Sequence, residues 1–337
     1  MFKKYNAIFF DWDGTAVLSR TAPVDRAVNA MRPLLKKGIK LVIVSGTTIE
    51  NIADGKIESY FTEKELSNLY LGLGRGAYNY EFINGKPHIF KNMVPSKEEL
   101  LKIHKVCFEV HQELKRRYDF DTDIIFSRPN YCKVDLMVNN FRDQSLFMQE
   151  SEVKRLRNLL QIHGMTGGLK ELIELAEKTG CQYGVKVKTT CDAKYLEIGN
   201  TSKSDNVDCI LEKICLETTL SPRECVYLGD EYVGIEKGIF GSDSFMRTKK
   251  SIQGDFFDVS EVAGERPEGE AFGEKLKEAG NRVEVHRIAG AFHGYFALGI
   301  KFLHVQESFA YVNRFLETEE QEEGKHHEER ICTVEKT

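Results

Sequence analysis

The pattern of apolar and polar positions begins with a hydrophobic run from Tyr5 to Phe10, which ends in a group of acidic and small residues. Pro23 to Lys37 has the pattern of a helix, Gly38 suits its C-terminal cap, and Ile39 to Val44 is a second continuous apolar run. Runs that are apolar on both faces are typical of parallel strands covered by helices. The pattern predicts a βαβ unit, whose strands end at one edge of a sheet.

A second unit of this kind is expected far downstream. A helix is predicted over residues 206–217, and the strand from Cys225 to Leu228 ends in Gly229-Asp230-Glu231. Between the two units, from about Gly74 to Ile198, hairpin and strand patterns alternate with amphipathic helices. We therefore predict an α/β protein with a Rossmann-like parallel-sheet core from residues 1–73 and 199–267, and an inserted α+β cap domain from residues 74–198.

The pattern changes again after about Glu268. A helix is expected over residues 271–279, an alternating strand over 282–288 and a helix over 305–316, with Ala291-Phe292-His293-Gly294-Tyr295-Phe296 between the last two. Residues 318–337 are rich in glutamate and contain His326-His327. We predict that this acidic tail is disordered, because it has too few apolar residues to bury.

Composition narrows the possible partners. The chain has 337 residues, is 41% hydrophobic and carries a formal net charge of -5. It has no basic stripe with interleaved aromatic residues, which argues against nucleic acid as a partner, and no apolar run near the roughly 20 residues that span a membrane.

The start of the chain leads directly into the first strand, so we expect a cytoplasmic protein. Its eight cysteines contain no Cys-x-x-Cys pair and are expected to be reduced.

Asp11 and Asp13 follow the first predicted strand. Residues two apart in an extended chain share a side, and two carboxylates about 4 Å apart repel by roughly 4 kcal/mol at an effective dielectric near 20. The pair therefore favours a bound cation. The simpler alternative is that Asp13-Gly14 only forms a turn. A calcium-binding EF-hand is excluded, because its loop would need glycine and glutamate where Ala16 and Ala22 stand.

Gly72-x-Gly74-x-x-Ala77 superficially matches a dinucleotide-binding loop. That loop requires a helix directly after the glycines. Here a hairpin is predicted instead, because Asn84-Gly85 between two apolar runs favours a type I′ turn. We expect these glycines to shape a crossing between domains.

Four segments in order, Asp11-x-Asp13-Gly14-Thr15, Ser45-Gly46-Thr47, Lys203 and Gly229-Asp230-Glu231, resemble the motifs of the haloacid dehalogenase (HAD) superfamily of phosphohydrolases. The resemblance covers about residues 1–267. The position of the insert, between the second and third motifs, resembles the branch of Cof-type sugar-phosphate phosphatases and phosphomannomutases, which carry an α/β cap there.

The resemblance implies roles in phosphoryl transfer. Asp11 is expected to be the nucleophile, and Asp13 the acid that protonates the leaving oxygen and later activates water. Ser45, with Gly46 and Thr47, is expected to bind the phosphate. Lys203 is expected to neutralise charge on the nucleophile and the phosphoryl oxygens.

The resemblance also implies a Mg²⁺ ion, held by Asp11, Asp230 and the backbone carbonyl of Asp13. Hard oxygen ligands of this kind suit Mg²⁺ better than zinc. Many relatives carry a second acid four positions after the residue that corresponds to Asp230, but this chain has Gly234 there. Glu231 is therefore our candidate for the missing metal-binding acid.

Residues from about 268 to 317 resemble the C-terminal segment of a carboxylesterase or lipase of the α/β-hydrolase fold. In that fold a His-Gly-aromatic turn, here His293-Gly294-Tyr295, carries the catalytic base. The chain contains no Gly-x-Ser-x-Gly and no His-Gly-Gly motif, so a nucleophile and an oxyanion hole are missing. We expect His293 to be a turn residue in an appended fragment rather than part of an esterase.

The expected function is a Mg²⁺-dependent phosphatase that acts on a small phosphorylated metabolite, with a sugar phosphate as the leading expectation. Two alternatives remain open. A sugar phosphomutase would use the same phosphorylated Asp11, and a catalytically weakened relative would serve as a binding or regulatory protein. The sequence does not separate phosphatase from phosphomutase, because both use the same core motifs.

Overall fold

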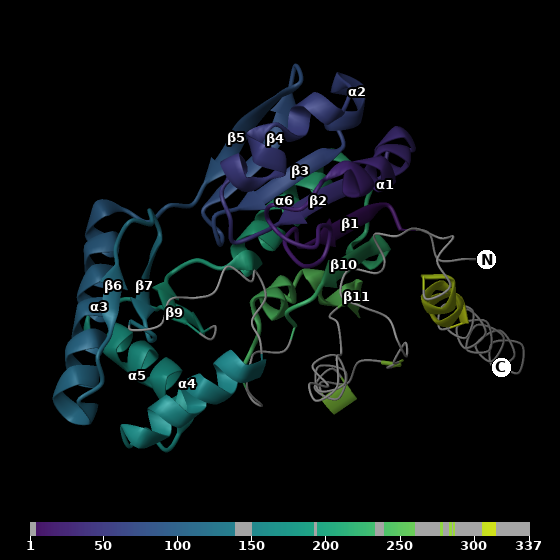
Figure 1. The fold of residues 1–337 in the computed structure, drawn as a ribbon. Helices are drawn as coiled ribbons and strands as arrows, with labels where there is room; N and C mark the ends of the chain where they lie inside the picture. Colours follow the sequence, from purple (N-terminus) through teal and green to yellow (C-terminus); the bar gives the residue numbers. More distant parts are fainter. Residues whose placement is uncertain are drawn as a thin grey trace, which may run out of the picture.

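The computed structural model describes residues 5–138, 150–191, 194–232, 239–259, 277–278, 283–284, 286 and 305–314. These residues form two α/β bodies, each with its own sheet (Figure 1). The larger body is the core, and the smaller one is the cap. The expected α/β core with an inserted α+β cap is confirmed.

The core contains one mixed sheet of seven strands in the order β11-β10-β1-β2-β3-β4-β5. Five strands are parallel, and the last two join antiparallel. The parallel strands carry apolar residues on both faces, as the sequence predicts for a covered sheet. Their bounds are β1 (Ala7–Phe10), β2 (Lys40–Val44), β3 (Leu69–Leu73), β10 (Cys225–Gly229) and β11 (Asp255–Asp258), with β4 (Tyr78–Ile83) and β5 (Lys86–Asn92) antiparallel.

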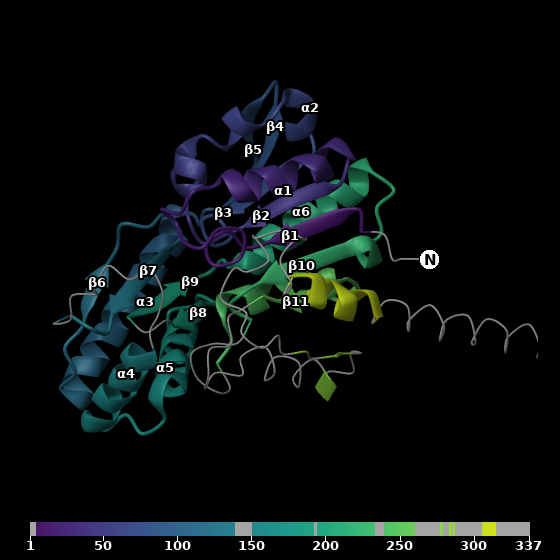
Figure 2. The same cartoon turned by 45° about the vertical axis from the view of Figure 1, so that its right-hand side comes forward.

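Helices cover both faces of the core sheet (Figure 2). Helix α1 (Asp25–Lys36) packs on the side chains of Leu41 and Ile43, whereas α6 (Lys203–Glu217) packs on those of Val42 and Val44. Successive residues of a strand point to opposite faces, so β2 supplies both hydrophobic layers. The short helix α2 (Glu63–Leu66) and six 3-10 turns complete the core: η1 (Ile49–Asn51), η2 (Ala53–Gly55), η3 (Ile57–Tyr60), η4 (Pro222–Glu224), η5 (Ser242–Met246) and η6 (Ser251–Gln253).

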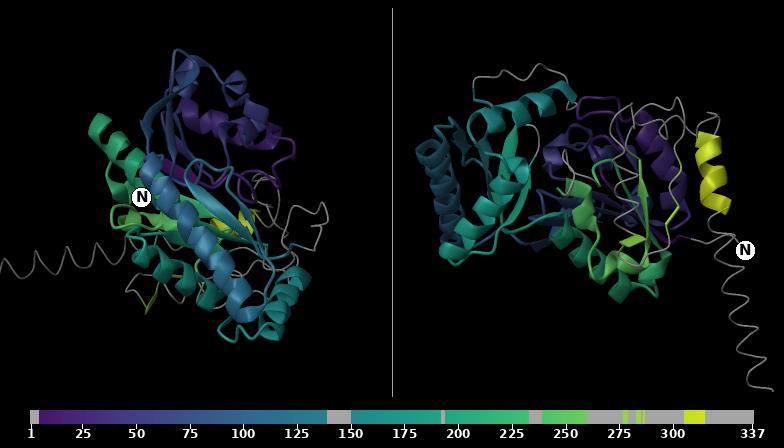
Figure 3. Two further views of the ribbon diagram at one scale, coloured as in Figure 1. Left: turned by 90° about the vertical axis from the view of Figure 1, so that its left-hand side faces the viewer. Right: turned by 90° about the horizontal axis from the view of Figure 1, so that it is seen from below.

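The cap contains an antiparallel sheet of four strands in the order β6-β7-β9-β8. Its helices pack on one face of this sheet and form a separate hydrophobic core with it, and the right-hand view of Figure 3 shows the two bodies side by side. The strands are β6 (Asp123–Ile125), β7 (Tyr131–Asp135), β8 (Lys188–Cys191) and β9 (Tyr195–Gly199). The helices are α3 (Lys97–Tyr118), α4 (Glu150–Ile162) and α5 (Gly168–Gln182).

The hairpin β4–β5 corrects the expected start of the cap at residue 74. It pairs with β3 and extends the core sheet, with Leu71 opposite Tyr80. The turn at Asn84-Gly85 has positive φ at both residues, 51° and 74°, as the predicted type I′ turn requires. A hairpin that follows directly on β3 pairs most easily with that neighbouring edge. The cap therefore begins after Asn92.

The C-terminal segment contacts the core through Val283. Val283 packs against the hydrophobic cluster that contains Cys225 and Tyr227, so this part of the chain touches the core sheet. Residues 305–314 are helical, within the range expected for the last helix. His293 and the predicted acidic tail lie outside the described residues, as do most of the expected helix 271–279 and the expected strand 282–288.

None of the helices in the described ranges has the length and apolar character needed to cross a membrane.

Because the cap has its own hydrophobic core, damage to that core should remain local. We expect Leu172→Ala, at a fully buried position of α5, to destabilise the cap by about 2–5 kcal/mol. Hydrogen exchange should accelerate in α3, α5 and β7, while β1, β2 and β3 keep their protection. Leu101→Ala, at a half-exposed position of α3, is the control and should change little. Equal loss of protection in both bodies would contradict two separate cores.

Candidate active site

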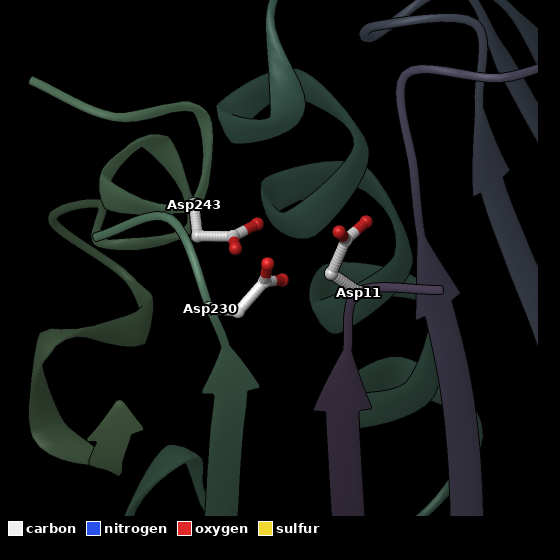
Figure 4. Close-up of side chains that lie close together, drawn as sticks. All are labelled: Asp11, Asp230 and Asp243. Atoms are coloured by element: carbon white, nitrogen blue, oxygen red, sulfur yellow. The ribbon is translucent and has the colours of Figure 1, made fainter. Parts of the chain in front are cut away.

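Three aspartates meet where neighbouring core strands end (Figure 4). Asp11 follows β1 and Asp230 follows β10, and these strands are parallel neighbours with Phe10 level with Leu228. Asp243 lies on η5. One carboxylate oxygen from each residue lies within 4.8 Å of the other two. The fold therefore brings Asp11 and Asp230 together at one edge of the sheet, as the sequence predicts.

The turn after β1 is built around these carboxylates. The Asp11 N–H donates a hydrogen bond to the Leu228 carbonyl at 3.1 Å, which extends the strand pairing by one residue to Asp11. Gly14 has a φ of +91°, and a Cβ atom there would lie 2.3 Å from Asp230 Oδ2. Only glycine allows both this backbone conformation and this close approach. Thr15 Oγ1 then donates a hydrogen bond to Asp230 Oδ1 at 2.8 Å.

Asp243 is the site residue that the sequence analysis missed. Its Oδ2 accepts a hydrogen bond from the Glu231 N–H at 2.8 Å, and its own N–H donates to the Glu231 carbonyl at 3.0 Å. The chain therefore leaves the site after Glu231 and returns beside it at Asp243. Gly234, four residues after Asp230, lies outside the described residues, and the acid that meets Asp11 and Asp230 stands 13 residues after Asp230. In the sequence Asp243 follows a Gly-Ser pair, a pattern too common to identify a site residue.

Lys203 provides the positive charge of this group. Its Nζ lies 2.9 Å from Asp11 Oδ1 and 2.6 Å from Asp243 Oδ1, and its side chain is only 5% exposed. It is the first residue of α6, whose start is fixed by a capping box between Ser202 and Asp205. Two lysines of the preceding segment pair with other acids, Lys188 with Asp205 and Lys194 with Asp135.

Burial and charge set the ionisation of the group. Burial raises the pKa of Asp11 to about 8, although Lys203 opposes this shift. Burial and the neighbouring Asp243 carboxylate also hold the pKa of Asp230 well above its usual range. Burial by itself would lower the pKa of Lys203, but Asp11 and Asp243 outweigh it and raise that pKa. One lysine thus does not compensate three carboxylates, and a further cation is needed for all three to ionise.

The residues fit a divalent cation. Three carboxylates whose oxygens lie within 4.8 Å of one another offer the hard donors that Mg²⁺ prefers. Burial and the neighbouring carboxylates raise the pKa of Asp11 and of Asp230, and a bound cation would favour their charged forms. Asp11, Asp230 and Asp243 are therefore the side chains that would hold the ion.

Glu231 does not belong to this carboxylate group, contrary to the metal role expected for it. Its side chain is exposed, and its Oε2 accepts a hydrogen bond from Ser242 Oγ at 2.8 Å. The Glu231 carboxylate nevertheless lies close enough to the group for its negative charge to raise the pKa of Asp11 and of Asp230.

Asp13 also lies apart from the three carboxylates. Its Oδ2 is 3.2 Å from Arg20 Nη2, while its Oδ1 is buried and accepts no hydrogen bond from the part of the chain that the structure describes. The intervening Trp12 is buried in the hydrophobic layer on the α1 side of the sheet. The two aspartates of the first motif therefore have different partners, which suits two different roles.

The second motif lies at the end of the adjacent strand. Ile43 of β2 is level with Phe10 of β1, so Ser45 and Asp11 come from the same edge of the sheet. Ser45 is buried, and its Oγ accepts a hydrogen bond from the Thr47 N–H at 3.3 Å. Thr47 Oγ1 accepts a hydrogen bond from Asn51 Nδ2 at 2.8 Å, and Gly46 is exposed. The turn formed by Ser45, Gly46 and Thr47 therefore lies at the same edge of the sheet as Asp11.

Comparison with known proteins supports this architecture. The chain is 27% identical over 142 residues to the Mycoplasma genitalium protein MG265, which is named provisionally as a phosphatase. That match covers 40% of this chain and about half, 49%, of the relative. No protein-family model matches the chain.

Solved structures with a similar fold include the IMP-nucleotidase of Plasmodium falciparum. Its N-terminally truncated, IMP-bound form superimposes with a TM-score of 0.53 at 13% identity, covering 76% of this chain and 65% of the other. Its ATP-bound form gives a TM-score of 0.52 at 13% identity, covering 76% and 57%. The chain therefore shares the overall fold of these nucleotidase structures. Within this fold the side chains of Asp11, Lys203 and Asp230 come together.

The geometry predicts that Asp243, rather than Glu231, contributes to metal binding. We expect Asp243→Asn to weaken Mg²⁺ affinity by about 10- to 100-fold, because it removes a buried negative charge from the carboxylate group. The affinity is measured from the rise in melting temperature with Mg²⁺ concentration. Glu231→Gln is the matched control and should keep the affinity within about twofold. The reverse order of the two variants would refute this assignment.

Proposed function

We propose that the protein is a divalent-cation-dependent phosphatase that hydrolyses a small phosphorylated metabolite through a phosphorylated Asp11. One observation carries this proposal: the buried Lys203 bridges Asp11 and Asp243 directly beside Asp230. A structural ion pair would need one carboxylate. Three carboxylates around one lysine suit a site that receives a cation and a phosphoryl group.

The first half-reaction assigns one task to each residue. Asp11 attacks the phosphorus, and a carboxylate can do so without a general base. Lys203 offsets the negative charge that gathers on Asp11 and on the phosphoryl oxygens. Asp13 gives a proton to the leaving oxygen, a role that suits the buried Oδ1 left without a hydrogen bond. The Ser45 hydroxyl and the following turn donate hydrogen bonds to the phosphoryl oxygens.

In the second half-reaction Asp13 takes a proton from water, which attacks the phosphorus and releases Asp11 and inorganic phosphate. The same residue therefore acts first as acid and then as base. Arg20, 3.2 Å from Asp13 Oδ2, holds the carboxylate while its other oxygen handles the proton. A bound Mg²⁺ would supply charge stabilisation for the oxygens of the reacting phosphate.

We propose a sugar phosphate as the leading substrate class, in keeping with the Cof-type position of the cap. The relatives also support nucleotides as a second class to test, because the structures of IMP-nucleotidase are solved with IMP and with ATP. Both classes are small phosphate esters. The cap would select between them by contacts to the leaving group, and it would exclude water when closed.

A phosphomutase and a binding protein without activity remain alternatives. A phosphomutase would return the phosphoryl group to a sugar that stays bound, so its product is an isomer and no inorganic phosphate appears. A binding protein would show neither product. A panel of sugar phosphates and nucleotides with Mg²⁺, analysed for both products, separates the three functions.

Asp11→Asn should lower hydrolysis of p-nitrophenyl phosphate by on the order of 10⁴-fold or more, because an amide cannot form the phosphorylated intermediate. The fold should persist, since Lys203 keeps its contact with Asp243. Circular dichroism checks the fold, and a phosphate-release assay measures turnover. Asp25→Asn, at an exposed position of α1, serves as the control. Wild-type turnover in Asp11→Asn would overturn the assignment.

Removal of divalent cations by EDTA should abolish hydrolysis, and added Mg²⁺ should restore it. The reason is that the three carboxylates, which lie within 4.8 Å of one another, repel an anionic substrate until a cation offsets them. Zn²⁺ should restore less activity, because the site offers no histidine or cysteine. Full activity in EDTA would contradict the proposed cation site.

A further inference from the structure

The turn Gly74-Arg75-Gly76, between β3 and β4, has an unusual backbone. All three residues have positive φ, at 65°, 55° and 99°. Glycine adopts this conformation freely, but arginine does so at a cost, so the surrounding contacts must hold it there. The side chain of Arg75 is 6% exposed, which is rare for an arginine.

This turn touches both loops that form the phosphate site. The Gly74 N–H donates a hydrogen bond to the Thr47 carbonyl at 2.8 Å, in the second motif. Arg75 Nη1 donates to the Thr201 carbonyl at 2.9 Å, two residues before Lys203. A Cβ atom on Gly76 would lie 2.5 Å from the Ser202 carbonyl oxygen, so the backbones are in direct contact.

The same arginine also holds the cap. Nη2 of Arg75 donates to the Lys188 carbonyl at 2.8 Å and to Thr190 Oγ1 at 3.1 Å, both on β8. Its Nε lies 3.3 Å from Glu197 Oε2 on β9, and the guanidinium lies 5.4 Å from the ring centre of Tyr131 on β7. One side chain from the core therefore contacts three of the four cap strands.

A cap residue makes the reciprocal connection. The fully buried Asn130, next to β7, donates from its Nδ2 to the Gly74 carbonyl at 2.8 Å and to Thr201 Oγ1 at 2.9 Å. The Gly74-Arg75-Gly76 turn and the segment before Lys203 are thus held together from both bodies.

We infer that Arg75 is a positioning residue that fixes the cap sheet relative to the phosphate site by joining β8 and β9 to the segment that carries Lys203. This inference rests on the proposed phosphatase function. The face of the cap sheet that carries Lys188, Thr190 and Glu197 is the one turned toward the core at this point. Arg75 thereby sets the distance between that face and the reacting group.

A substitution at position 75 can keep some of these contacts and remove others. Lysine at position 75 keeps the charge for Glu197 but cannot reach the Thr201 carbonyl and β8 together. We expect Arg75→Lys to lower kcat for p-nitrophenyl phosphate by about 10-fold and Arg75→Met by about 100-fold, because small displacements of reacting groups have effects of that size. KM for this small substrate should change less than threefold.

Arg32→Met is the matched control. Arg32 also donates to a backbone carbonyl, that of Tyr60, and lies over an aromatic ring, that of Phe61, but it is on α1. It should lower the melting temperature without lowering kcat per folded molecule. A purely structural role of Arg75 would give the same result for both arginines, and that result would overturn the inference.

Two cap-side variants test the coupling without altering Arg75. Thr190→Val removes the hydroxyl that accepts from Arg75 and donates to Glu197, and Glu197→Gln removes the charge that pairs with Arg75 and Lys133. Both keep the size of the side chain, so both are expected to fold. Each should lower kcat by about 3- to 10-fold while Mg²⁺ affinity stays unchanged. Unchanged kcat in both variants would show that the cap contacts do not position the site.

Hydrogen exchange provides a readout that needs no activity. In Arg75→Lys, amides of the first turn of α6 and of residues 188–190 should exchange at least about tenfold faster, whereas in Arg32→Met they should match the wild type. If the wild type hydrolyses no phosphate ester, the proposed function fails, but this measurement still decides the role of Arg75. Unchanged exchange at both segments would refute it.

Discussion

The contact on which the site depends is the buried Lys203 between Asp11 and Asp243. An ammonium group loses its hydration when it is buried, and only close carboxylates compensate that loss. Removing one partner of such a buried pair typically costs about 3–5 kcal/mol. The first turn of α6, the end of β1 and the turn η5 are therefore held in one arrangement by a single charge. Asp230 joins them because β10 lies next to β1.

The division between core and cap follows from two separate hydrophobic clusters. The core sheet is covered on both faces, whereas the helices of the cap cover one face of its sheet. The other face carries polar residues, including Lys188, Thr190 and Glu197, and Arg75 meets it there. A protein built in this way can keep the chemistry in the core and vary the recognition in the cap.

Much of the fold was predictable because it depends on local patterns. The apolar runs of β1, β2 and β10, the helices α1 and α6, and the Asn84-Gly85 turn all follow from residue type and spacing. The partner of the β4–β5 hairpin was not predictable in the same way. A hairpin has two free edges, and the choice between the core sheet and the cap sheet depends on which edge is available in the folded chain.

For the site, the sequence by itself predicted that Asp11 and Asp230 stand at strand ends, which converge in a parallel sheet, and the family resemblance added Lys203. Only the tertiary structure decided that Asp243, rather than Glu231, meets Asp11 and Asp230 in the carboxylate group. Asp243 is held beside the site by hydrogen bonds to the Glu231 backbone, a pairing that no local pattern encodes. The same holds for Arg75, whose partners on β8 and β9 lie more than 100 residues away along the chain. Contacts between distant segments depend on how complete domains pack, and a sequence pattern records only what neighbouring residues do.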